Sequence, residues 1–369
     1  MNILFLTDKI DYVSGVAKHL YYLTNEIIKK KEDKVYIVCS GGDMKEEFIN
    51  SGANVIEYPG MSFENRTEMK FLISIGFIMR FCVANKVSII HSHTHYTANL
   101  AYFVSRIIFI RTVQTVHGLI PEEGKLPHFR ADHYIAVNKM IIDYMTYQKI
   151  KPAKITVIRQ GVPAYTEPVK KVRPLKVLCA SRLVFDKGVD IFINSVSIIS
   201  DKLEAEAEFI VAGEGEYEAE LKKLAVEKGA KINFMGKLNN LNQALAESHI
   251  FVFPSRIKTE GFPVVLNEAG MNTNLIITSN FDSLNEVLES TKDCIIFYND
   301  DYEDLAKKLM FAINNYGNLL ILADHWKRKC LQEYTSEIMT EKTSKVYTRL
   351  LGTSWIYILT GIIPGKYEI

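Results

Sequence analysis

The sequence predicts an α/β protein made of two doubly wound parallel sheets, and three observations predict it. Short apolar runs of four to six residues, rich in Val and Ile, alternate with longer amphipathic segments. Such runs are typical of parallel strands buried on both faces. The alternation occurs in two successive series, and 369 residues is the length of about two domains. We therefore expect two Rossmann-like domains.

The apolar runs give the expected strands in chain order. The first series is Ile3–Leu6, Val35–Cys39, Val55–Tyr58, Val87–Ile90, Thr112–Val116, Tyr134–Val137 and Ile155–Ile158. The second series is Lys176–Ala180, Glu208–Ala212, Ile232–Met235, Ile250–Phe253, Leu275–Thr278 and Asp293–Phe297. Amphipathic segments such as Val16–Lys31, Asp190–Ile199 and Glu216–Lys228 are the expected helices between them.

A proline-rich stretch separates the two series. Residues 163–174 hold three prolines and no apolar period, so we expect domains at 1–165 and 166–344. The sign of charge changes at the same place, from a net +5 in residues 1–165 to a net −4 in residues 166–369. The basic half is therefore expected to meet anionic material, such as a membrane surface or a phosphorylated ligand.

Composition excludes a disordered chain, a collagen and a small protein held together by disulfides. With 48% hydrophobic and 24% charged residues, the chain is an ordinary globular protein. The five cysteines form no CxxC pair, so we expect free buried thiols in a reducing cytoplasm. The first residues do not read as a signal peptide. The longest apolar stretches, Phe71–Met79 and Trp355–Pro364, are shorter than the roughly 20 residues of a membrane span.

In open parallel sheets, ligands bind at the carboxyl ends of the strands, so the loops there should carry the chemistry. The first such loop lacks GxGxxG, which argues against dinucleotide binding. Gly15 precedes a helix and would let backbone N–H groups approach a phosphate. A plain turn residue is the equal alternative at this position.

Histidines follow two strands of the first domain. His91, His93 and His95 alternate after the fourth run, and His117 with Gly118 ends the fifth. A polar loop at a ligand cleft is the favoured interpretation of the first group, with a metal site and core histidines as alternatives. His117 is expected to point into the cleft, and a capping or core histidine is its alternative.

In the second domain, Arg182 and Lys187 flank the turn that opens a helix after the first strand. Two cations at a helix N-terminus form an anion clamp, in which Arg can hold a diphosphate through two hydrogen bonds. Solvated loop cations are the alternative. No GxxxxGK[ST] motif is present, so this is not a P-loop of the Walker A type.

The segment Thr259–Glu268 follows the strand Ile250–Phe253 and carries two carboxylates. Pro263 suits the first position of a helix. Glu260 would then lie on the loop and Glu268 in the second helical turn, so the two can reach different parts of one extended ligand. The alternative is that Glu260 is an ordinary surface carboxylate and that Glu268 is a charged residue of the helix that contacts no ligand.

Together these motifs resemble glycosyltransferase family 4, the retaining group 1 glycosyltransferases of the GT-B fold. The resemblance rests on E-G-F-P with its two carboxylates, on S-R-L-V-F-D-K-G, on T-V-H-G and on V-A-G-E-G-E-Y-E-A-E-L. It spans roughly residues 1–350 in the expected order. It implies two domains facing a central cleft, with a C-terminal segment of about 345–369 packing back on the first domain.

The resemblance also implies roles for residues of this chain. Arg182 and Lys187 would neutralise the leaving diphosphate, and Glu268 would bind the donor ribose. Glu260 and His117 would contact the transferred sugar, while His93 and His95 would line the acceptor cleft. The remaining donor-binding positions that it implies are Gly15, Gly213, Lys237, Leu238, Gly261, Phe262 and Pro263.

The activity implied is retaining transfer of a hexosyl or N-acetylhexosaminyl group, without a metal or cofactor. The expected donor is a nucleotide-diphosphate sugar, with a UDP-sugar favoured. The expected acceptor is a glycan or lipid-linked molecule, as in lipopolysaccharide, O-antigen or capsule synthesis. The alternatives are a metal-dependent hydrolase using His91, His93 and His95, a sugar-nucleotide epimerase, and a GT-B partner protein without catalytic activity.

Two further features bear on this expectation. Two stretches after Glu268, Asn272–Leu275 and Phe281–Glu286, differ from the family's usual sequence. In the family these stretches lie near the donor phosphates, so the phosphate-binding part of the site is expected to differ here. Cations and apolar residues of the first domain, including Arg80, Arg106 and Ile73, are expected to dock on the anionic inner face of the cell membrane. Solvated helix faces around an ordinary core are the alternative, and no nucleic-acid partner is expected.

Overall fold

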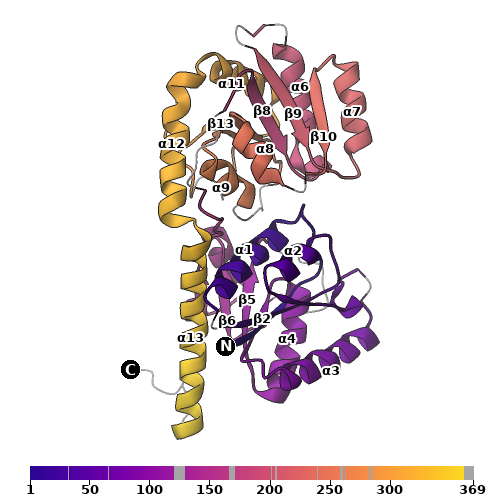
Figure 1. Ribbon diagram of the computed structural model, residues 1–369, viewed down its shortest axis with the longest axis vertical. Coiled ribbons are helices and arrows are strands. Elements are labelled where there is room, and N and C mark those ends of the chain that lie inside the picture. The colour runs from indigo at the N-terminus through magenta and orange to yellow at the C-terminus, as the bar shows by residue number, and fades with distance from the viewer. Residues whose placement is uncertain are drawn as a thin grey trace. The chain divides into compact units, whose positions relative to one another are not determined.

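The computed structural model describes residues 1–31, 33–64, 66–119, 129–165, 171–200, 202–203, 206–238, 240–257, 261, 263–281, 284 and 286–360. The chain divides into two compact units (Figure 1). The first unit is Met1–Gly161 with the segment from Ser336 onward, and the second is Val162–Thr335. Each unit holds one parallel sheet, which confirms the predicted fold class.

The boundaries differ from the sequence expectation by a few residues. Residues 162–165 belong to the second unit, where the Val162 N–H donates to the Tyr334 carbonyl at 2.9 Å. Residues 336–344 belong to the first unit, because they begin the long helix α13 (Ser336–Thr360), whose Met339 lies in the first unit's core. This second boundary falls at the break between α12 (Tyr316–Glu333) and α13, and no proline marks it.

The first unit has a seven-stranded sheet in the order β3-β2-β1-β4-β5-β6-β7. Its strands are β1 Asn2–Leu6, β2 Lys34–Cys39, β3 Asn54–Glu57, β4 Ile89–Ser92, β5 Arg111–Val116, β6 His133–Ala136 and β7 Ile155–Val157. Its helices are α1 Gly15–Lys29, α2 Lys45–Asn50, α3 Glu68–Ala84, α4 His95–Ile108, α5 Lys139–Tyr147 and α13, with short 3₁₀ turns η1 Pro59–Met61 and η2 Pro152–Lys154.

Successive residues of β1 serve two cores, because side chains alternate across a strand. Ile3 and Phe5 pack with α1 and α13 on one face of the sheet. Leu4 and Leu6 pack with α3 and α4 on the other face. Burial on both faces explains why the expected strands are continuous apolar runs.

The second unit has a six-stranded parallel sheet in the order β10-β9-β8-β11-β12-β13. Its strands are β8 Leu175–Ala180, β9 Ala207–Ala212, β10 Ile232–Gly236, β11 Ile250–Phe253, β12 Leu275–Ser279 and β13 Ile295–Phe297. Its helices are α6 Val189–Ile199, α7 Glu218–Glu227, α8 Leu241–Glu247, α9 Val264–Met271, α11 Tyr302–Asn314 and α12 Tyr316–Glu333, with the 3₁₀ turn η3 Phe185–Lys187.

Both sheets reverse their strand order at one point, between β1 and β4 in the first unit and between β8 and β11 in the second. In open α/β sheets, the loops diverge at such a point, and ligands bind there at the carboxyl ends of the strands. The expected strand Val87–Ile90 lies two residues later, at Ile89–Ser92, because Ile89 is the residue that pairs with Ile3. This shift moves His91 from the loop into the sheet.

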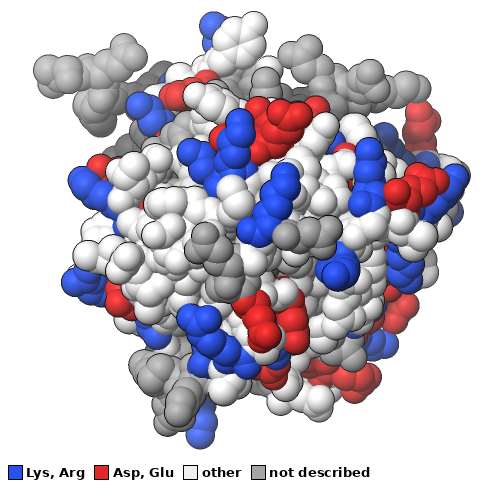
Figure 2. Space-filling model, turned by 90° about the horizontal axis from the view of Figure 1, so that it is seen from above, with Lys and Arg blue, Asp and Glu red and all other residues white. Residues whose placement is uncertain are grey.

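The structure places the cysteines, the charged side chains and the apolar helices that the composition raised. All five cysteines are free and buried, as predicted. On the face drawn in Figure 2, Lys and Arg alternate with Asp and Glu, so neither sign of charge dominates it. Among the described residues, none of the helices has both the length and the apolar character needed to cross a bilayer.

Candidate functional site

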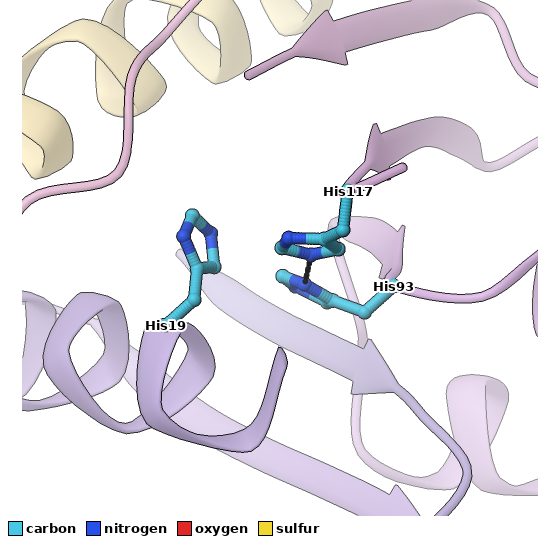
Figure 3. A group of neighbouring side chains, drawn as sticks. All are labelled: His19, His93 and His117. Carbon is cyan, nitrogen blue, oxygen red and sulfur yellow. Dashed lines mark hydrogen bonds between the residues drawn. The ribbon is translucent and has the colours of Figure 1, made fainter. Parts of the chain in front are cut away.

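At the switch point of the first unit's sheet, three imidazoles meet (Figure 3). His19 lies one turn into α1, whose N-cap Ser14 accepts a hydrogen bond from the Ala17 N–H. His93 follows β4, and its backbone N–H donates to the Leu6 carbonyl at the end of β1. His117 follows β5 directly. Three separate elements therefore place these rings at the switch point of the sheet.

The three rings point toward one another in Figure 3. His93 Nδ1 and His117 Nε2 lie 3.0 Å apart and share a hydrogen bond. The ring of His19 stands edge-on to that of His117, with centroids 4.7 Å apart. One nitrogen from each ring can be chosen so that all three lie within 4.8 Å of one another.

Burial sets the charge of this cluster. It lowers the pKa of His19 to about 4, and it lowers the pKa of His93 and His117 well below the usual 6.5. The neighbouring imidazoles act in the same direction on His93 and His117. All three rings are therefore neutral at pH 7, and each offers one N–H donor and one lone pair.

The metal alternative named His91, His93 and His95, and the structure shows that this set is wrong. His91 is fully buried, and its two ring nitrogens bond the Tyr347 hydroxyl at 2.6 Å and the Thr115 hydroxyl at 2.7 Å. Both nitrogens are thus used inside the core. In the part of the chain that the structure describes, the group of side chains that could hold a metal is His19, His93 and His117, and of the three predicted histidines it contains only His93.

His95 and Gly15 lie at the N-termini of the two helices that flank this switch point. His95 is the first residue of α4, and its ring packs edge-on against Phe63. Gly15 is the first residue of α1, and a Cβ there would meet no atom within 4 Å. Packing among the described residues therefore does not require this glycine, and its predicted place beside the phosphates stays a prediction.

In the second unit, the loop after β8 carries the two predicted clamp cations. Arg182 is exposed, and Lys187 ends the turn η3. Gly188 follows with φ +66°, and a Cβ there would lie 2.0 Å from the Pro254 carbonyl oxygen. Only glycine fits, so the loop after β8 is pressed against the loop after β11.

The structure brings Arg182 and Lys187 close enough to interact. Burial, followed by the positive charge of Arg182, lowers the pKa of Lys187 to about 8. The Lys187 ammonium also lies 5.9 Å from the ring centre of Phe253. A half-buried ammonium beside a second cation is poorly solvated, and an anion bound between the two would stabilise both.

Arg256, two residues beyond Pro254, holds this loop in place, and the sequence analysis missed it. Its guanidinium donates to both carboxylate oxygens of Asp190, at 2.7 Å each, and to the Phe185 carbonyl at 2.8 Å. Its backbone N–H donates to the Asp186 carbonyl. Its position in the loop after β11, three residues from the strand end, was a usable signal, because the other candidate residues were found in such loops.

The predicted residues near the base lie beside β9 and β10. Gly213 has φ +134°, and a Cβ there would lie 1.9 Å from the Ser181 carbonyl oxygen, so close backbone packing requires this glycine. The Lys237 ammonium pairs with Glu214 at 3.0 Å. Leu238 follows and is half-buried. Their contact with a nucleotide base stays a prediction.

The carboxylate segment is described only in part. Glu268 lies in the second turn of α9, as predicted, and is 3% exposed. Pro263 caps α9 rather than occupying its first helical position, because its ψ of 123° is extended. Gly261 is buried just before it. Glu260 and Phe262 lie outside the described residues, so their predicted roles stay predictions.

Solved structures share the fold of this chain. The chain matches a glycosyltransferase from Rickettsia africae with a TM-score of 0.80, 17% identity and coverage of 95% and 98% of the two chains. It matches HepE of Anabaena in complex with UDP-glucose with a TM-score of 0.80, 15% identity and coverage of 95% and 100%. With its two parallel-sheet units, the chain has the GT-B glycosyltransferase fold.

Family models cover both units. The model for Glycosyltransferase Family 4 matches residues 13–164, and the model for Glycosyl transferases group 1 matches residues 166–330. The chain belongs to glycosyltransferase family 4, the group 1 glycosyltransferases. The resemblance inferred from the motifs is thereby confirmed, and the hydrolase alternative falls away.

Curated relatives are distant but cover most of the chain. One is the N,N'-diacetylbacillosaminyl-diphospho-undecaprenol alpha-1,3-N-acetylgalactosaminyltransferase of Campylobacter jejuni, 22% identical, covering 93% of this chain and 99% of the relative. Another is a polypeptide of the human phosphatidylinositol N-acetylglucosaminyltransferase, 23% identical, covering 92% of this chain and 74% of the relative.

Proposed function

We propose that this glycosyltransferase moves a hexosyl or N-acetylhexosaminyl group from a nucleotide-diphosphate sugar, with a UDP-sugar favoured, to a lipid-linked acceptor. Transfer retains the anomeric configuration and needs no divalent ion. The product would serve surface polysaccharide synthesis, such as lipopolysaccharide, O-antigen or capsule.

The observation that carries this proposal is the pair Arg182 and Lys187 on the loop after β8. Cleavage of the bond between the sugar and the diphosphate builds negative charge on the leaving phosphate. Lys187 is half-buried beside Arg182, and burial followed by the Arg182 charge lowers its pKa to about 8, so a bound diphosphate would stabilise an ammonium group that its surroundings disfavour. This clamp takes the place that a divalent ion has in metal-dependent transferases.

The relatives support the kind of acceptor. The names of the Campylobacter jejuni and human proteins specify N-acetylhexosaminyl groups, with a diphospho-undecaprenol in the first case and a phosphatidylinositol in the second. We infer an acceptor of the same chemistry here: a sugar or other polyol joined to a lipid through a phosphate or diphosphate. Within this proposal, His93 and His95 line the acceptor side, and His117 contacts the transferred sugar.

A lipid-linked acceptor requires contact with a membrane surface, and the helices α3 and α4 offer one. They pack on each other through Phe71 and Phe103, whose ring centroids lie 5.7 Å apart. Large apolar side chains of this pair and of the residue after α4 are exposed: Met69 67%, Leu72 63%, Ile73 56%, Ile107 54% and Phe109 92%. Exposed cations accompany them, namely Lys70, Arg80 and Arg106. Apolar and basic side chains together suit an anionic bilayer surface.

Transfer and donor binding test the proposal directly. Full-length protein is assayed with a panel of UDP- and GDP-sugars and a sugar-bearing undecaprenyl diphosphate, and product configuration is read by NMR. Calorimetry then compares UDP with uridine on the double variant Arg182→Ala with Lys187→Ala. We expect UDP binding to weaken far more than uridine binding. The control Lys223→Ala removes an exposed cation of α7 and should change neither.

Equal losses of UDP and uridine would refute the clamp. Absence of transfer with every donor, despite tight UDP binding, would instead favour the alternative of a partner protein without catalytic activity.

Vesicle flotation tests the membrane contact. Protein with Leu72→Glu and Ile73→Glu should lose binding to vesicles that contain phosphatidylglycerol, whereas Val226→Glu, at an even more exposed apolar position on α7, should not. Wild-type protein that fails to float with anionic vesicles would contradict the contact and leave donor binding unaffected.

A further inference from the structure

The cluster of His19, His93 and His117 has the donor set of a metal site. Its rings come from α1 and from the loops after β4 and β5, and one nitrogen of each lies within 4.8 Å of the others (Figure 3). His93 Nδ1 and His117 Nε2 are already 3.0 Å apart. In a tetrahedral zinc site, where each nitrogen is about 2.0–2.1 Å from the ion, two ligand nitrogens are separated by about 3.3 Å.

Each ring of the cluster also carries a buried nitrogen without a hydrogen-bond partner. His19 Nδ1, His93 Nε2 and His117 Nδ1 are buried and find no hydrogen-bond partner in the part of the chain that the structure describes. Buried polar atoms are almost always paired, because an unpaired one forfeits its hydrogen bond to water. In His93 and His117 these are the nitrogens that their shared hydrogen bond does not use. Every ring of the cluster therefore keeps a nitrogen with no bond to the rest of the described chain.

We propose that His19, His93 and His117 bind a first-row transition-metal ion, of which Zn²⁺ suits this donor set best. Neutral imidazole is a preferred ligand of Zn²⁺, whereas Mg²⁺ and Ca²⁺ require oxygen ligands, which this cluster does not contain. His19 and His93 are 2% and 3% exposed, while His117 is half-buried. The fourth coordination position would therefore open on the side of His117, toward water or an anion.

This site is not a cofactor site for sugar transfer. His117 is the residue that the proposed function places against the transferred sugar, and an ion held by its ring with an open fourth position would occupy the side from which the sugar approaches. A bound ion would thus compete with that contact and lower turnover. This consequence rests on the proposed function, whereas metal binding itself does not.

Binding is measured without any donor, on the full chain freed of metal by a chelator. Titration with Zn²⁺ in a calorimeter should show about one ion per chain. Co²⁺ should bind with a visible absorption spectrum of nitrogen ligation. A sulfur-to-cobalt charge-transfer band would place the ion on one of the five free cysteines and overturn the assignment.

Variants then identify the ligands. His19→Gln and His117→Gln should each weaken Zn²⁺ binding by at least about 10-fold, since loss of even an outer-shell partner costs that much. His95→Gln is the matched control: it lies two residues from His93 but outside the cluster, and should bind Zn²⁺ as wild type does. Equal binding by all three variants would overturn the site.

Two further measurements complete the test. If a histidine variant fails to fold, the melting temperature of wild-type protein decides: Zn²⁺ should raise it and Mg²⁺ should not. In the transfer assay, Zn²⁺ should inhibit and a chelator should restore activity. Zn²⁺ binding without inhibition would overturn the competition with sugar and leave the metal site standing.

Discussion

Arg256 and Asp190 form a two-point ion pair, in which Nη1 and Nη2 of the guanidinium lie 2.7 Å from the two carboxylate oxygens. Both side chains are largely buried, at 16% and 15% exposure. Nη1 also donates to the Phe185 carbonyl, and the guanidinium carbon lies 4.2 Å from the centre of the Phe185 ring. Arg256 therefore fixes the turn that carries Lys187, which makes it a positioning residue for the proposed diphosphate clamp.

Loss of this planar two-point contact should loosen the clamp. Arg256→Lys keeps the charge but cannot bond both oxygens of Asp190 in one plane, so we expect UDP affinity to fall by about 10-fold. The KM for the donor should rise with it. Calorimetry gives the affinity and steady-state kinetics the KM. Asp300→Asn is the control, because Asp300 is 64% exposed and its pair with Arg256 should contribute little. A drop in melting temperature with unchanged UDP affinity would contradict the positioning role.

The lowered pKa of Lys187, about 8, predicts how donor affinity depends on pH. A bound diphosphate favours the ammonium form, so binding above pH 8 takes up a proton. UDP affinity should be steady below pH 8 and should fall by up to about tenfold per pH unit above it. Calorimetry in buffers of different ionisation enthalpy counts the proton. Lys187→Arg cannot lose its charge in this range and should abolish the fall; a fall that persists in this variant would refute the assignment.

Substitutions at Glu268 and Glu260 should change different kinetic parameters. Glu268 is proposed to hold the ribose, which does not change during reaction, so Glu268→Gln should mainly raise the donor KM. Glu260 is proposed to lie where the sugar develops positive character, so Glu260→Gln should mainly lower kcat, by roughly 100-fold or more. Steady-state transfer kinetics on proteins checked by circular dichroism separate the two effects. Near-normal kinetics in both variants would refute the pair.

Turnover should survive exhaustive chelation. The proposed clamp uses protein cations at the leaving diphosphate, and the proposed histidine site is not needed for transfer. Transfer in the presence of EDTA should therefore equal or exceed transfer without it. A complete loss that added metal reverses would show instead that a divalent ion takes part in the reaction.

Tyr347 should anchor α13 through His91. Tyr347→Phe would leave His91 Nδ1 buried without a partner, which costs about 1–3 kcal/mol. Urea denaturation should show a lower free energy of unfolding by that amount. Tyr147→Phe, at a position 75% exposed, is the control and should change stability little. Equal stabilities of the two variants would contradict the anchoring role.

Local pattern alone predicted the strands and the loops that end them. Val and Ile runs such as Ile250–Phe253 need burial on both faces, so they predict strands before any partner is known. Because parallel strands end at one edge, the same pattern pointed to Arg182, Lys187 and His117 as site residues. Glu268 was placed correctly in the second turn of α9 by counting from Pro263.

Tertiary structure alone decided which of these side chains meet. His91 is two residues from His93 in sequence, yet a two-residue shift of the strand places it in the core, bonded to Tyr347 from a helix 256 positions away. His19 joins His93 and His117 only because α1 packs over the end of the sheet. Hydrophobic periodicity predicts the helices and strands, since each residue's burial depends on its neighbours in the chain. The contacts between His19 and His93, and between Arg256 and Asp190, depend on packing between elements, which no local pattern encodes.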